Sequence, residues 1–377
     1  MTIYIVKPGD TIDQIAQEQG STVGELSYAN QIPVPYRLAV GQAILIPGGE
    51  TAESRRIVTA NGYAYPFISP WVLQQTLPYL TNLLVFSYGF TPQGTLVPPL
   101  VSEDWMLSEA RNVNVTPVLV LTPLGPDGRF NNNLIHSVLT NPPAKSELIQ
   151  QLLNLTEEKG YGGVDVDFEY ILAEDRDLFT SFVAELREAM NQVEKFVSVA
   201  LAPKTSADQK GLLYEGKDYG GLGAAADEVL LMAYEWGYTY GPAMAVAPLN
   251  KVRQVVEYAL TEIPSEKINL GIPNYGYDWT LPYVQGESKA VTIGNVEAVQ
   301  IAIENDVPIR FDETAMSPFF TYASEGREHE VWFEDARSMQ AKFGLLAEYN
   351  LQGIGVWQIM RLFRAMWLIY AGMYYVI

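Results

Sequence analysis

The stretch GGVDVDFEY, residues 162–170, alternates apolar and acidic side chains. Side chains of a β-strand point to opposite faces in turn. Asp165, Asp167 and Glu169 therefore share one face of the predicted strand, and the apolar residues between them share the other. A row of buried carboxyl groups is costly unless protons are shared or hydrogen bonds satisfy the oxygens. Because close like charges raise one another's pKa, this acidic row suits a group that holds and donates a proton near neutral pH.

Two other interpretations fit the same alternation. An edge strand would expose the acidic face to solvent, although the upstream helical pattern that ends at Gly160 favours an internal strand. Oxygen-rich clusters also bind magnesium or calcium. Three alternating carboxylates on one strand are too nearly collinear to surround an ion, so the sequence predicts no metal site there.

Seven further short apolar runs alternate with helical patterns along the chain, which indicates a parallel α/β architecture. Eight strands in about 300 residues favour a closed TIM (β/α)8 barrel over an open doubly wound sheet. The last member of the acidic row would then lie at the C-terminal mouth, where barrel active sites form. The eight predicted strands are residues 57–60, 83–88, 115–121, 163–170, 197–201, 229–234, 268–272 and 353–357.

The spacing of these runs predicts the domain organisation. Residues 49–56 are small, polar and non-periodic, which is typical of a linker between a first domain of residues 1–48 and a barrel of residues 57–377. The gap between the seventh and eighth strands is much longer than the others, so about residues 281–334 should form an α+β insertion beside the mouth. The apolar segment 366–377 is shorter than the roughly 18 to 20 residues of a membrane helix, which predicts a buried packing helix and no membrane partner.

Composition excludes several classes of function. The 44 acidic residues outnumber the 24 basic ones, for a net charge of −20, whereas a nucleic-acid partner needs a basic face. Absence of cysteine excludes disulfides, thiolate zinc sites and cysteine nucleophiles. The two histidines, His136 and His329, are too few for a three-histidine zinc site. The N-terminal sequence shows no pattern of a secretory signal peptide.

The first domain reads strand, helix, helix, strand, with capping boxes at Thr11 and Thr22. It resembles the LysM module over its whole length, which implies a small βααβ domain that binds glycans containing N-acetylglucosamine. The groove would lie between the loops of residues 9–12 and 30–38. The matching positions are Tyr4, Val6, Gly9-Asp10-Thr11, Ile15-Ala16, Asn30, Val40-Gly41-Gln42 and Ile46-Pro47.

The resemblance implies a set of glycan-binding candidates in the two loops. For three of them, Gly9, Thr11 and Asn30, roles in turns and caps are the favoured interpretation. The full set is Gly9, Asp10, Thr11, Ile12, Asn30, Ile32 and Pro33.

The acidic row resembles the signature of glycoside hydrolase family 18, Asp-Gly-x-Asp-x-Asp-x-Glu, with Gly162 in the first position. Three further motifs stand in the family's order, and the Ser-x-Gly-Gly motif of the third strand is absent. The resemblance covers about 320 residues and is carried by several ordered motifs rather than by one strand. These motifs are Met232-Ala233-Tyr234-Glu235, with Glu for the family's Asp, then Gly271-Ile272-Pro273-Asn274-Tyr275-Gly276 and Gly355-Val356-Trp357.

This resemblance implies a retaining mechanism without an enzyme nucleophile or a cofactor. Glu169 would protonate the glycosidic oxygen while the substrate's own acetamido oxygen attacks the anomeric carbon. Asp167 would orient the acetamido group, and Asp165 would hold Asp167 and share its proton. Tyr234 would bond the acetamido oxygen, and Glu235 would contact sugar hydroxyls.

Further substrate contacts are expected around the mouth. Trp357, at the end of the last strand, would form a platform for a sugar. Tyr275 would either stack on sugar or pack the insertion, and Tyr63 is either a sugar contact or a core residue. Met232 and Asn274 complete the candidate set through their place in the family motifs.

A LysM module before such a barrel, without a signal peptide and with Glu235 for Asp, resembles the spore-cortex-lytic N-acetylglucosaminidases of endospore-forming bacteria. The resemblance implies a monomeric enzyme of the spore cortex or coat, or otherwise of the cell wall, that cleaves β-1,4 bonds next to N-acetylglucosamine in peptidoglycan. Chitin oligosaccharides are the alternative substrate. A non-catalytic glycan-binding coat protein is the rival class, and the intact acidic row argues against it.

Overall fold

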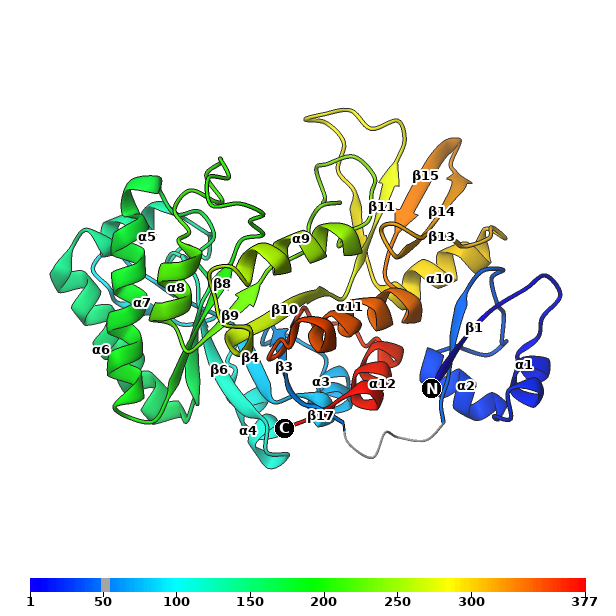
Figure 1. Ribbon diagram of the computed structural model, residues 1–377, viewed down its shortest axis with the longest axis horizontal. Coiled ribbons are helices and arrows are strands. Elements are labelled where there is room, and N and C mark those ends of the chain that lie inside the picture. The colour runs from blue at the N-terminus through cyan, green and yellow to red at the C-terminus, as the bar shows by residue number, and fades with distance from the viewer. Residues whose placement is uncertain (49–54) are drawn as a thin grey trace.

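The computed structural model describes residues 1–48 and 55–377. They form an N-terminal βααβ domain followed by an eight-stranded parallel barrel that carries a small inserted sheet (Figure 1). The expected fold class is therefore confirmed. Most of the expected linker, residues 49–54, lies outside the described residues.

The N-terminal domain folds around two short helices on a two-stranded antiparallel sheet. Both expected capping boxes are present, at Thr11 and Thr22. The side chain of Asn30 exchanges hydrogen bonds of 2.7 and 2.8 Å with the backbone of Leu45 and so ties the second helix to the sheet. The elements are β1 (Thr2–Ile5), α1 (Ile12–Glu18), α2 (Val23–Asn30) and β2 (Ala43–Ile46).

The barrel closes because its first and second strands, β3 and β4, pair in parallel. Each of its strands overlaps one of the eight expected runs. One difference is that β7 ends at Val166 rather than at residue 170, because only one more backbone bond, from Asp167 N to Leu121 O, continues the ladder. In chain order the strands are β3 (Ile57–Ala64), β4 (Asn82–Phe90), β6 (Thr116–Leu121), β7 (Gly163–Val166), β8 (Phe196–Leu201), β9 (Glu228–Leu231), β10 (Ile268–Pro273) and β16 (Gly353–Trp357).

Helices surround the barrel and bury its outer face. The packing helix expected at residues 366–377 is present as α12, which is buried against α11, but it ends at Met373 and is followed by a short strand. Within the described ranges, every helix is too short or too polar to cross a membrane. The helices are α3 (Pro70–Thr76), α4 (Asp104–Asn112), α5 (Asn133–Leu139), α6 (Pro142–Lys159), α7 (Arg176–Asn191), α8 (Tyr219–Ala225), α9 (Leu249–Ala259), α11 (Ala336–Tyr349) and α12 (Arg364–Met373), with short 3-10 turns at Leu77–Tyr79, Ala173–Asp175 and Ser265–Lys267. Two-residue strands, β5 (Leu96–Val97) and β17 (Tyr375–Val376), extend the sheet beside β4 and β3.

The insertion between β10 and β16 is an antiparallel five-stranded sheet with one helix. Its first strand starts at Gly276, ahead of the expected start at residue 281, because the chain turns into this sheet directly after β10. The sheet therefore stands beside the mouth of the barrel (Figure 1). Its elements are β11 (Gly276–Thr280), β12 (Val291–Ile293), α10 (Asn295–Glu304), β13 (Arg310–Asp312), β14 (Ser317–Ser324) and β15 (Arg327–Trp332).

The N-terminal domain is docked on the barrel beside α12 and α10 (Figure 1). The guanidinium of Arg364 lies 3.9 Å from the centroid of the Tyr28 ring and donates to Tyr28 O at 3.1 Å and to Gln75 Oε1 at 2.8 Å. The side chain of Gln31 bonds the backbone of Arg364 and Leu362. Arg364 therefore joins α2 of the first domain to the barrel by stacking and by charge-assisted hydrogen bonds.

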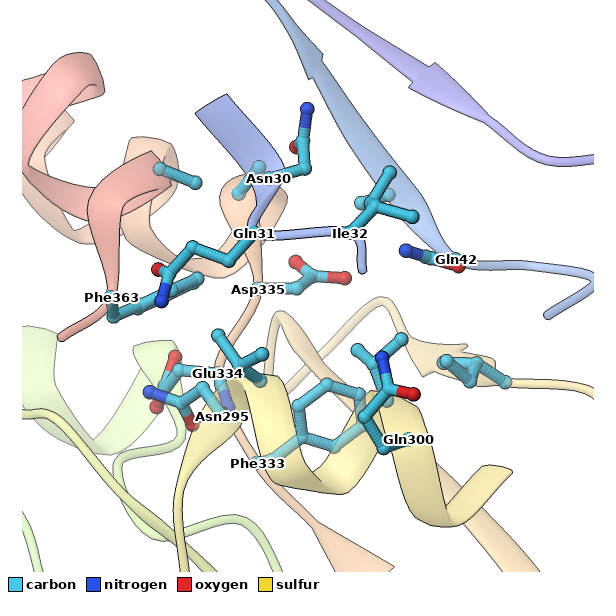
Figure 2. Close-up of a pocket in the computed structure, with 16 residues that line it drawn as sticks. Asn30, Gln31, Ile32, Gln42, Asn295, Gln300, Phe333, Glu334, Asp335 and Phe363 are labelled. Atoms are coloured by element: carbon cyan, nitrogen blue, oxygen red, sulfur yellow. Dashed lines mark hydrogen bonds between the residues drawn. The ribbon is translucent and has the colours of Figure 1, made fainter. Parts of the chain in front are cut away.

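A second contact joins the first domain to the insertion. Ile309 N donates to Val40 O at 2.8 Å, and Gly41 packs so closely that a Cβ there would lie 1.9 Å from Ile309 O. Between the two contacts, Gln31 and Ile32 face Asn295 across a cavity of about 30 Å³ (Figure 2). That volume corresponds to about one water molecule, so the cavity belongs to a packed interface.

We expect Arg364→Ala to loosen this interface, because a hydrogen bond to a charged group contributes about 1.5–3 kcal/mol to stability. Hydrogen exchange of the Ile309 amide, whose N–H crosses to Val40, should become about tenfold faster. The matched control is Arg253→Ala, which removes a guanidinium bonded to Glu348 and Tyr349 within the barrel. Unchanged exchange at Ile309 in the Arg364 variant would contradict the role given to this arginine.

Candidate active site

The acidic row runs from the interior of the barrel to its mouth. Asp165 is fully buried, Asp167 is partly buried and the Glu169 side chain reaches solvent. Asp165 accepts a hydrogen bond of 2.9 Å from the Tyr63 hydroxyl of β3 and one of 2.6 Å from the Ser198 hydroxyl of β8. The row therefore begins among side chains that point into the barrel.

The apolar residues of the same segment face the helices. Val164, Val166 and Phe168 are buried, and the Phe168 ring stacks on Phe179 and Phe182 of α7 at centroid distances of 5.7 and 6.0 Å. Strand β7 lies between β6 and β8, so the interpretation as an exposed edge strand is wrong. The alternation of faces continues past the end of β7, which places the carboxyl groups on the inner side.

Burial sets the proton affinity of the row. It raises the pKa of Asp165, against hydrogen bonds from Ser198 and Tyr63 that lower it. It raises the pKa of Asp167 well above the usual range, with the charges of Glu169 and Asp165 adding to the effect. Burial also raises the pKa of Glu169, which favours a protonated carboxyl group at the mouth.

One carboxylate oxygen of the row is available to accept a hydrogen bond from a ligand. Asp167 Oδ1 is buried and has no hydrogen-bond partner among residues 1–48 and 55–377. Buried polar atoms are nearly always bonded, so an unpartnered acceptor beside a cavity mouth points to a donor supplied by a ligand. An amide N–H of a substrate fits this acceptor.

Tyr234 and Glu235 follow β9 and reach the same mouth. Burial raises the pKa of Tyr234 well above the usual range, and the charges of Asp167 and Glu169 raise it further, so its hydroxyl remains a hydrogen-bond donor. Glu235 accepts hydrogen bonds from the hydroxyls of Tyr275 and Tyr277. Its backbone φ of +67° is a strained conformation of the kind that is often retained at functional sites.

Aromatic rings surround Trp357 at the end of β16. Its ring centroid lies 4.9 Å from that of Phe86, 5.8 Å from that of Tyr63 and 6.1 Å from that of Tyr65. Tyr65 stacks on the exposed Phe67 at 5.1 Å, so the aromatic surface continues outward. Aromatic faces of this kind bind the apolar faces of sugar rings.

Other expected substrate contacts lie below the mouth. Tyr63 is 3% exposed and uses its hydroxyl on Asp165, and Asn274 is 2% exposed and donates to the backbone oxygens of Gln358 and Arg361. Tyr275 is buried beneath Glu235, and Met232 is half-buried. Tyr63 and Tyr275 thus hold carboxyl groups by hydrogen bonds, and contact of the four residues with substrate stays a prediction.

The LysM candidates are divided between surface and interior. Gly9, Thr11 and Pro33 are exposed, and Asp10 is half-buried, with its carboxylate held by the Tyr4 hydroxyl at 2.8 Å and the Lys7 amide at 2.7 Å. Ile12 and Ile32 are buried in the domain core. Asn30 bonds the backbone of α2 and β2.

Two residues near the acidic row were not expected from the sequence. Ser198 interrupts an otherwise apolar strand, and a polar residue at an inward position of a barrel strand is the sequence signal that marks it. Lys217 lies in the loop before α8 and is fully buried, and nothing in the surrounding loop sequence marks it.

One group of metal-ligand types lies away from this mouth within the described ranges. The ligand atoms of His136, Glu174 and Asp175 lie within 4.8 Å of one another. His136 Nδ1 is 2.8 Å from Asp175 Oδ2, which is accounted for by a hydrogen bond.

Comparisons with known proteins identify the families of the barrel and of the N-terminal domain. Residues 121–361 match the family model of glycosyl hydrolases family 18, and residues 4–47 match that of the LysM domain. A cortical fragment-lytic enzyme of Bacillus subtilis (strain 168) is 36% identical over 100% of this chain and 99% of its own length.

Solved structures give the same result. The spore cortex-lytic enzyme SleL of Bacillus megaterium QM B1551 matches with a TM-score of 0.93 and 32% identity, over 100% of this chain and 98% of that chain. SleL of Bacillus cereus matches with a TM-score of 0.82 and 34% identity, over 100% and 87%. The protein described here thus belongs to glycosyl hydrolases family 18, carries a LysM domain in front of its barrel, and is a glycoside hydrolase.

Proposed function

We propose that this chain hydrolyses β-1,4 bonds next to N-acetylglucosamine in bacterial peptidoglycan, with spore cortex as the substrate. The observation that carries the proposal is the acidic row, in which a proton-holding Glu169 stands at the mouth beside the unpartnered oxygen of Asp167. The names of the relatives, cortical fragment-lytic enzyme and spore cortex-lytic enzyme, support cortex as the polymer.

The first step breaks the glycosidic bond. Glu169 transfers its proton to the bridging oxygen, and the bond from that oxygen to the anomeric carbon breaks. The substrate's 2-acetamido oxygen attacks the anomeric carbon, which gives an oxazolinium ion and makes an enzyme nucleophile unnecessary. Asp167 Oδ1 accepts the acetamido N–H and stabilises the positive charge that develops there.

The second step restores the enzyme. Water attacks the anomeric carbon while Glu169, now ionised, takes a proton from it, so the oxazolinium ring opens with overall retention. Asp165, which Tyr63 and Ser198 hold in place, keeps Asp167 positioned and shares its proton. The Tyr234 hydroxyl donates to the acetamido oxygen, Glu235 contacts sugar hydroxyls and Trp357 supports the ring.

The LysM domain adds a second glycan contact outside the barrel. We propose that its exposed loops, which include Thr11 and Pro33, hold the polymer while the mouth cleaves it. All of these groups come from one chain, which is consistent with action as a monomer at the spore. The contacts at Arg364 and Gly41 dock the LysM domain on the barrel and its insertion, and so keep the two proposed glycan-binding sites in a fixed relation.

Glu169→Gln should abolish most of the hydrolysis because the amide cannot supply the proton. We expect kcat to fall about 10²–10⁴-fold with little change in glycan binding. Glu174→Gln is the matched control, since it makes the same chemical change at an exposed position further along the loop. Release of soluble fragments from cortex should persist in the control. Equal rates in both variants would remove Glu169 from the mechanism.

Ser198→Ala should displace the acid limb of the pH–activity profile. The hydroxyl donates to Asp165 and lowers the pKa of that carboxyl group, so its removal raises the pKa. Activity needs negative charge on the aspartate pair, and the acid limb therefore moves to higher pH by up to about 1 unit. Ser206→Ala, which removes a hydroxyl bonded to Asp208 elsewhere, should leave the limb in place.

Mass spectrometry of products would identify the polymer. Digestion of purified cortex, vegetative wall and chitin oligosaccharides should release cortex fragments with N-acetylglucosamine at the new reducing end. Products that end in muramic acid would contradict the assigned bond. Cleavage of chitin oligosaccharides alone would favour the alternative substrate.

A further inference from the structure

Lys217 is a buried cation that the mechanism above does not use. Its side chain is fully buried, and its ammonium donates to the backbone oxygens of Phe168, just after β7, and, at 2.9 Å, of Ala200 in β8. The Phe179 ring lies 5.3 Å from Nζ. Both hydrogen-bond acceptors are neutral, so the charge of the lysine is not balanced by them.

The two acceptors lie where the barrel ladder opens. The pairing of β7 with β8 ends at Val166 and Val199, and Phe168 and Ala200 lie just beyond it. The ammonium therefore connects the segment after β7 to β8, where the backbone hydrogen bonds between the two strands have ended. Phe168 immediately precedes Glu169, so this bridge holds the peptide that carries the carboxyl group at the mouth.

The compensating charge comes from the acidic row. Burial lowers the pKa of Lys217 to about 8, while Asp167, Glu169 and Asp165 act in the opposite direction and favour the ammonium. In return, the ammonium lowers the pKa of all three carboxyl groups. An isolated ammonium at this depth would be costly, which indicates that the lysine and the row form one electrostatic unit.

We propose that Lys217 is a positioning residue for hydrolysis, which fixes the backbone under Glu169 and supplies the counter-charge that lets the aspartate pair stay ionised beside a protonated Glu169. The inference rests on the proposed roles of Asp167 and Glu169. In this proposal the one positive charge of the ammonium offsets the one negative charge that Asp165 and Asp167 share when Glu169 holds its proton.

The other titratable groups at this mouth act on the same carboxyl groups. Tyr63 bonds Asp165 from β3, and Tyr234 and Glu235 approach Asp167 and Glu169 from the end of β9. The Tyr63 hydroxyl lowers the pKa of Asp165 through its hydrogen bond, whereas Glu235 and Glu169 repel each other when both are ionised. Lys217 is the cation that lowers the pKa of each member of the row in the part of the chain that the structure describes.

Lys217→Met tests the proposal. Loss of the cation raises the pKa of the three carboxyl groups, so both limbs of the kcat/KM profile should move to higher pH by about 1 unit. At the wild-type optimum kcat should fall about 10²-fold, while KM changes by less than about threefold. The matched control is Lys267→Met, which removes an ammonium bonded to two backbone oxygens, Gly223 O and Ala226 O, away from the row.

Chemical rescue separates charge from packing. The chain has no cysteine, so Lys217→Cys offers one alkylation site in the unfolded protein. Refolding after treatment with 2-bromoethylamine restores an ammonium, and treatment with 1-bromopropane gives a neutral side chain of nearly the same shape. The aminoethyl form should recover the wild-type profile, and the propyl form should show the displaced one.

A lower activity with an unmoved pH profile, or equal profiles for the two alkylated forms, would overturn the role of Lys217. Retained hydrolysis in Glu169→Gln would instead overturn the proposed mechanism on which this inference rests. The two failures are therefore distinguishable in the same assay. Wild-type protein taken through the same unfolding and refolding is the reference for recovery.

Discussion

The cost of removing carboxyl groups from water governs the centre of this protein. Three of them follow one another from the barrel interior to its mouth, and burial raises the pKa of each. The fold offsets that cost with two hydroxyl donors at Asp165 and one buried cation, Lys217. Among the described residues Asp167 Oδ1 has no hydrogen-bond partner, so the row is only partly satisfied by the fold.

The rest of the architecture maintains this arrangement. Stacking of Phe168 on α7 fixes which face of the β7 segment is apolar, and a shift of one residue would turn every carboxyl group toward the helices. The insertion contributes Tyr277, whose hydroxyl bonds Glu235 across the mouth at 3.0 Å. The site therefore depends on packing far from the reacting atoms, because those contacts set the register of its acidic groups.

The sequence predicts the parts of this molecule that local patterns encode. Alternation at residues 162–170 identified the inward carboxyl groups, and Thr11 and Thr22 marked two helix starts by chemistry confined to four residues each. It did not predict Lys217, because a lysine in an irregular loop is ordinarily solvated and only the tertiary fold buries it. Tyr63 shows the same limit, since its hydroxyl reaches Asp165 across the barrel and not along the chain.

Other buried acids show that neither a raised pKa nor an unpartnered oxygen is by itself the mark of a functional carboxyl group in the described residues. Burial also raises the pKa of Glu228, at the start of β9. Its two oxygens accept hydrogen bonds of 3.0 Å from Asn269 and 2.7 Å from Gln352, and so neither is left for a ligand. A raised pKa is thus common to Glu228 and Asp167. Glu334 also has an unpartnered oxygen, but its other oxygen accepts a hydrogen bond of 2.8 Å from the buried ammonium of Lys342. The unpartnered oxygen of Asp167 lies instead beside Glu169 at the open end of the barrel, which supports the role proposed for it.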